Sequence, residues 1–117
     1  MSIEAHVIDA LSATLGVPVR ADVPKDRPAV LVTVERTAGG RDHYGMLDRP
    51  QLAVQSWAPT RHEAAQLADR VDGAMHALVG WPITRVTTDR IYNFPAEGSP
   101  RYQGVYDLVC HVTEQEG

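Results

Sequence analysis

The sequence predicts an α+β domain in which two helices pack on one face of a mostly antiparallel four-stranded sheet, in the order α-β-β-α-β-β. Two observations predict this fold: apolar residues recur at helical spacing in two segments and alternate with other residues in four more. Helices gathered on one face of an antiparallel sheet bury such a pattern. The chain has 117 residues and a mass of 12.8 kDa, so we expect a single domain over residues 1–117.

The first helix is expected over residues 3–15. Ser2 is a suitable N-cap, and Gly16 followed by Pro18 ends the helix. Residues 17–28 contain three prolines, which favours an extended segment at the edge of the sheet or outside it. The apolar stripe of this helix consists of Ile3, Val7, Ile8, Leu11 and Leu15.

Alternating residues predict the first two strands, over residues 29–36 and 51–57, joined as a hairpin. The connection between them, residues 37–50, contains Gly39, Gly40 and Gly45. A connection of this length in a small domain is usually either functional or disordered.

A second helix is expected over residues 61–79. Thr60 and Glu63 have the spacing of a capping box at its start, and Gly80 and Pro82 end it. The last two strands are expected over residues 83–94 and 102–113, with a turn between them.

Composition excludes several classes of protein. The net charge of −4 and the scattered arginines disfavour a nucleic-acid-binding module. The apolar runs are a few residues long, whereas a membrane span needs about 20, and the N-terminus has no signal-peptide pattern. The single cysteine, Cys110, has no partner for an internal disulfide. We therefore expect a protein made in a reducing cytoplasm, without cofactor or metal.

Few residues form a catalytic pattern. His62 and Glu63 begin a zinc-protease-like motif, but Gln66 stands where the second histidine is required. Neighbours in a strand point to opposite faces, so Cys110 and His111 do not form a nucleophile and base pair. Asp42, His43 and Asp48 share one connection, which we interpret as a solvated polar loop. A small enzyme acting through these three residues is the alternative from a different functional class.

Three strings of residues carry a resemblance to a known family. They are residues 23–28 leading into 30–40, residues 47–58 followed by the alanine-rich helix, and residues 93–95 with 99–106. Their joint order and spacing resemble the tail terminator proteins of long-tailed phages of actinobacteria. These proteins are related in fold to minor tail and tail-completion proteins of other siphophages and of prophages. The resemblance covers about residues 17–113.

The resemblance implies a structural protein of the virion, with no catalysis and no cofactor. Such proteins form a ring, usually of six copies, at the head-proximal end of the tail tube. The ring ends polymerisation of the major tail tube protein and offers a surface to a head-completion or connector protein for head-tail joining. DNA passes through it without specific binding, and no membrane is involved. A connector or stopper ring of the neck is the alternative within this class.

A ring requires interfaces, and two groups of residues are candidates for them. The long connection suggests axial contacts with the tube or the connector. Trp57 and Trp81 are either core anchors or interface residues, because tryptophan contributes strongly to both. Arg101 and Tyr102 either set the register of the last strand or form a contact patch. The candidate interface residues are thus Arg41, Asp42, His43, Tyr44, Met46, Trp57, Arg101 and Tyr102.

Overall fold

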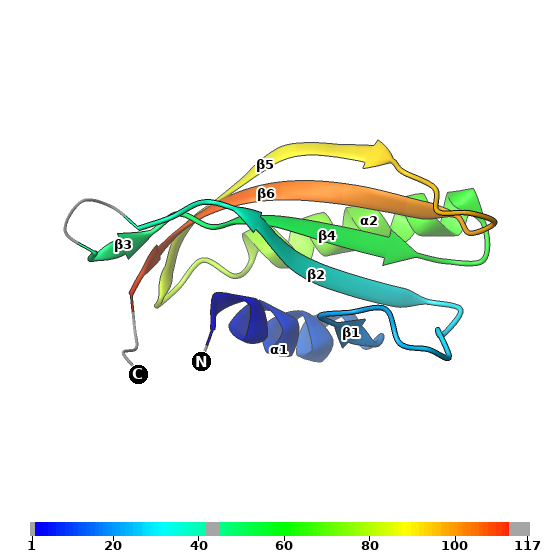
Figure 1. Ribbon diagram of the computed structural model, residues 1–117, viewed down its shortest axis with the longest axis horizontal. Helices are drawn as coiled ribbons and strands as arrows, with labels where there is room; N and C mark the ends of the chain where they lie inside the picture. Colours follow the sequence, from blue (N-terminus) through cyan, green and yellow to red (C-terminus); the bar gives the residue numbers. More distant parts are fainter. Residues whose placement is uncertain (1, 42–44, 113–117) are drawn as a thin grey trace.

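The computed structural model describes residues 2–41 and 45–112. Figure 1 shows a fan of strands with one helix beneath it and the other behind it, and the longest strands run along the long axis of the molecule. In chain order the elements are α1 (Ile3–Leu15), β1 (Val19–Arg20), β2 (Leu31–Ala38), β3 (Leu47–Asp48), β4 (Gln51–Trp57), α2 (Arg61–His76), β5 (Ile83–Asn93) and β6 (Arg101–His111).

The predicted fold class is wrong in the number and order of the strands. The described residues form a six-stranded mixed sheet, in which β1 pairs with β2 in parallel and β3 pairs with β6 antiparallel. The spatial order is β1-β2-β4-β6-β3, and β5 also pairs with β6. The two strands that the prediction omitted have two residues each. A strand that short shows no alternation of apolar and polar residues, so its sequence pattern gave no signal.

The connection predicted over residues 37–50 contains parts of two strands, at residues 37–38 and 47–48. β2 continues to Ala38, and β3 pairs with β6 in the same register as β4 does, so that β3 and β4 lie end to end. Pro50 lies between them and has no N–H, but its carbonyl accepts from the backbone N–H of Leu108 at 2.9 Å. This part of the chain is therefore an interrupted strand rather than a free loop.

The helix boundaries follow from their caps. The hydroxyl of Ser2 accepts from the N–H of Ala5 at 3.1 Å, and Gly16 adopts a φ of 69° where α1 ends. The hydroxyl of Thr60 accepts from the N–H of Glu63 at 3.1 Å, so the predicted N-cap of α2 is confirmed. α2 ends at His76, three residues before its predicted end at residue 79.

One hydrophobic core joins both helices to the sheet. An arginine of α2, Arg70, donates to the carbonyl of Leu15 at 2.7 Å and so ties α2 to the end of α1. Among the described residues, no helix is both long and apolar enough to cross a membrane. The largest fully buried side chains are those of Tyr106, Leu11, Leu31, Leu52, Met75, Ile83 and Leu108.

Hydrogen bonds at the edge of this core connect α2 to the two long strands. The hydroxyl of Tyr106 donates to the carboxylate of Asp72 at 3.2 Å, and the hydroxyl of Thr88 donates to the same oxygen at 2.7 Å. Burial, followed by the charge of Asp72, raises the pKa of Tyr106. The ring of Tyr106 lies over Gly104, where an added Cβ would be 2.7 Å from the ring. Position 104 therefore has no room for a side chain.

Candidate protein-interaction surfaces

Two of the predicted axial contact residues, Arg41 and Met46, lie where β3 meets β6. Asp42, His43 and Tyr44 lie outside the described part of the chain. Arg41 forms an isolated antiparallel bridge with Asp48. The side chain of Met46 is 68% exposed. Arg41 and Met46 are therefore held at the end of the sheet by backbone pairing on both sides of the undescribed residues.

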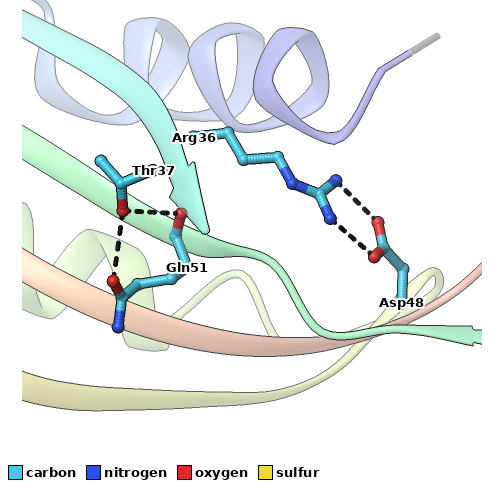
Figure 2. Close-up of polar contacts among 4 residues, drawn as sticks. All are labelled: Arg36, Thr37, Asp48 and Gln51. Atoms are coloured by element: carbon cyan, nitrogen blue, oxygen red, sulfur yellow. Dashed lines mark hydrogen bonds and ion pairs between the residues drawn. The ribbon is translucent and has the colours of Figure 1, made fainter. Parts of the chain in front are cut away.

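Asp48, the described member of the alternative catalytic group, is engaged by an arginine. Figure 2 shows the side chain of Arg36 donating to both of its carboxylate oxygens, at 2.8 and 2.9 Å. This bidentate hydrogen bonding raises the pKa of Arg36. Among the described residues, no group of three His, Cys, Asp or Glu side chains is arranged to hold a metal ion. Asp48 is thus a partner in an ion pair and not a free base.

Cys110 lies on the core face of β6 and is buried. Burial and the nearby carboxylate of Asp48 raise the pKa of this thiol to about 11. A thiol with such a pKa is almost fully protonated at neutral pH and is a poor nucleophile. Its neighbour His111 instead stacks on Trp81, with ring centroids 4.5 Å apart.

That stack belongs to an exposed apolar surface at the β3 end of the molecule. Trp81 is 74% exposed, so it is not a core anchor in this chain. It lies against the end of β6 through His111, and the carbonyl of Met46 accepts from the N–H of Val112 in the same region, at 3.0 Å. We call Met46, Trp81 and His111 the Trp81 surface. Its exposed apolar area is typical of a contact site.

The other tryptophan, Trp57, is only 6% exposed and lies at the opposite end of the sheet. The guanidinium carbons of Arg27 and Arg101 lie 4.7 and 4.8 Å from the centre of its ring. Arg101 also lies 4.5 Å from the ring centre of Phe94 and donates to the carbonyl of Phe94 at 2.7 Å. We call Arg27, Trp57, Phe94 and Arg101 the arginine cluster. Sequence reasoning selected Trp57 and Arg101 but missed Arg27, which is distant from both in the chain.

Tyr102 does not belong to this cluster. It lies beside Arg101 in β6 but points to the other face of the sheet, where it pairs in register with Ser56 and Asn93. Its side chain is half-buried. The pair of Arg101 and Tyr102 predicted from the sequence is therefore divided between the two faces.

The face of the sheet that turns away from the helices carries a polar ladder. Thr33 donates to Gln55 at 3.2 Å, Gln55 donates to Gln103 at 2.9 Å, and Gln103 donates to the hydroxyl of Tyr92. These side chains come from four adjacent strands, so they fix the register of the sheet across its width. A second row, whose first contact is drawn in Figure 2, consists of Thr37, Gln51 and Asp107.

The two groups of candidate interface residues form separate surfaces. β3 pairs with β6 at His111, whereas Trp57 pairs with β6 at Arg101, ten residue steps away. At about 3.3 Å per residue, this separation is about 33 Å. The molecule is 44 Å long, so the Trp81 surface and the arginine cluster lie near opposite ends.

Comparison with models of known protein families gives no match, and comparison with curated proteins gives none either. The function is therefore argued from the residues and their geometry.

Proposed function

We propose that this protein is a structural subunit of a phage or prophage tail, which assembles into a ring on the head-proximal end of the tail tube. The ring stops addition of tube protein and provides the surface for head-tail joining. The observation that carries the proposal is the presence of two chemically different surfaces near opposite ends of one rigid sheet. A ring subunit that caps a tube needs at least two contact surfaces, one for the next subunit and one for the tube or the connector.

The resemblance strings give a second line of support. The first string contains Arg27, the second contains Trp57, and the third contains Phe94 and Arg101. Side chains from all three strings meet in the arginine cluster. Each of the three strings thus contributes at least one residue to this surface.

The chemistry of the described residues agrees with a structural role. Asp48 is bound by Arg36, and the thiol of Cys110 is buried. The carboxylate of Asp72 accepts from the hydroxyl groups of Tyr106 and Thr88. Each of these groups stabilises the fold in the present structure, which favours assembly over catalysis.

Electron microscopy and native mass spectrometry of the purified protein test the proposal. The capping assay uses tubes assembled from the tail tube protein encoded near this gene. We expect closed rings, alone or on one end of each tube, and tubes that stop elongating once the ring is bound. A protein that stays monomeric alone and beside tubes, and leaves tube elongation unchanged, would refute the proposal. Binding to connector complexes without binding to tube ends would instead indicate a neck protein.

A further inference from the structure

We propose that the arginine cluster is the receptor for a carboxylate side chain of a neighbouring copy of this chain. The inference rests on the proposed function, since a ring requires one contact surface on each side of a subunit. It adds the residues that form one of these surfaces and the chemistry of the group that they bind.

The cluster presents hydrogen-bond donors without an anion. Arg27 donates to the hydroxyl of Ser99 at 2.7 Å, and Arg101 donates to the carbonyl of Phe94 and more weakly to Gln55 at 3.5 Å. Within residues 2–41 and 45–112, no carboxylate lies within ion-pair distance of either guanidinium. Each guanidinium has five N–H donors, so most of them remain available.

The buried indole of Trp57 is a second and independent observation. Its N–H is shielded from solvent and has no acceptor among the described residues, although the side chain is 94% buried. A buried donor without an acceptor costs about 1–3 kcal/mol. The two guanidinium groups that cover this indole present further donors, and a group that only accepts hydrogen bonds complements them. An ionised carboxylate is such a group.

Stacking holds both guanidinium groups in place before a partner arrives. Both arginines lie over the ring of Trp57, and Arg101 also lies over Phe94. Side chains that are already ordered lose little entropy on binding. Desolvation lowers the pKa of Arg101, whereas the carboxylate of Asp48 raises that of Arg36. The contrast shows that Arg101 is partly removed from water without receiving a counter-charge.

A second copy of this chain is the occupant that the charges favour. The chain has 15 acidic residues against 11 lysines and arginines, and its net charge of −4 repels nucleic acid. Exposed carboxylates without ion pairs among the described residues include those of Asp9 in α1 and Glu35 in β2. The pair of Arg36 and Asp48 shows the bidentate geometry that such a contact would use. Arginine and tryptophan are also the residue types that contribute most to the stability of protein interfaces.

The test compares two double variants with the same change in charge. Arg27→Gln with Arg101→Gln removes the guanidinium groups of the cluster, and Arg61→Gln with Arg85→Gln removes two exposed arginines that have no described polar partner. Sedimentation velocity over a range of protein concentrations measures self-association. We expect the cluster variant to weaken association by about tenfold or more, and the control variant to leave it within about twofold.

The indole N–H of Trp57 gives a readout that does not depend on those variants. The chain has two tryptophans, so Trp81→Phe leaves one indole signal in a ¹⁵N-correlated NMR spectrum. We expect this signal to shift as the protein associates, because a carboxylate bound by the two stacked arginines changes the electrostatic environment of the indole. Addition of a 20-nucleotide oligothymidine to the dilute protein is expected to leave it unchanged. A shift that occurs with the oligonucleotide and not on self-association would overturn the proposal in favour of a phosphate ligand.

Failure of this inference differs from failure of the proposed function. Normal rings formed by the cluster variant, with normal capping of tubes, would overturn the carboxylate receptor and leave the proposed function intact. Absence of rings and of tube-end binding in the unaltered protein would overturn both. Circular dichroism of each variant separates a lost contact from a lost fold.

Discussion

Substitution of Gly104 by alanine tests whether the packing of Tyr106 has the geometry that the structure gives. The added Cβ would lie 2.7 Å from Cε2, 3.0 Å from the hydroxyl oxygen and 3.1 Å from Cζ of Tyr106. The ring has no free direction of movement, because Tyr106 is 0% exposed and its hydroxyl is bound to Asp72. Overpacking of this kind costs about 1–3 kcal/mol. Replacing glycine restricts the unfolded chain and returns about 0.4–1 kcal/mol.

The expected net loss is therefore about 1–2 kcal/mol, and the midpoint of thermal unfolding falls by about 4–8 °C for a domain of this size. Circular dichroism during heating and during urea titration measures both quantities. Gly73→Ala is the matched control, since Gly73 lies in α2 and a Cβ there meets nothing within 4 Å. We expect that control to gain about 0.5–1 kcal/mol.

The reasoning also predicts a coupling between the two positions. In a protein that carries Tyr106→Leu, the ring is absent, and Gly104→Ala should then cost less than about 0.5 kcal/mol. An equal cost of Gly104→Ala with and without the ring would show that the steric argument is wrong.

Three further outcomes are expected. Asp48→Ala leaves the guanidinium of Arg36 without its partner and lowers the free energy of unfolding by about 1–2 kcal/mol in urea titration, with no such loss in Asp9→Ala. The raised pKa of Cys110, about 11 against an ordinary value of 9.0, stabilises the fold below pH 9, and this stabilisation is lost as the pH rises from about 9 to 11. Cys110→Ser should flatten that part of the curve of stability against pH. Trp81→Ser should change the free energy of unfolding by less than about 0.5 kcal/mol but weaken binding to tube ends in a pull-down assay.

The strongly periodic elements could be predicted from the sequence. α1 runs from Ile3 to Leu15 and β4 from Gln51 to Trp57, as expected, because caps and alternation lie within each segment. The sheet order could not be predicted in the same way. β1 and β3 form because β2 and β6 offer free hydrogen-bonding edges to them. The sequence of a two-residue segment does not indicate which strand it will pair with.

The candidate surfaces could likewise be predicted only in part. The importance of tryptophan was visible in the sequence, but its location was not: Trp57 is covered by two arginines, while Trp81 lies open to solvent. Arg27 comes from the proline-rich stretch, and only folding brings it to Trp57 and to Ser99. The polar ladder did have a sequence signal, since Gln51 and Gln55 alternate with apolar residues on one strand, as do Gln103 and Asp107 on the next.

The structure also changes how the axial contact is best understood. A free loop over residues 37–50 would reach a partner as a flexible arm and lose entropy on binding. Instead, β3 continues the line of β4 along β6, and Gly39 packs so closely that a Cβ would lie 2.0 Å from the carbonyl oxygen of Arg49. Deletion of this segment would remove part of the sheet and would not isolate a contact. The carbonyl of Met46 pairs with the N–H of Val112, and Trp81 lies in the turn closed by the hydrogen bonds between Gly80 and Ile83. A tube or connector that binds here therefore meets apolar side chains that the sheet holds in place. Binding to these side chains is favoured by burial of apolar area and is therefore less sensitive to salt than the arginine contact proposed for the other end of the subunit.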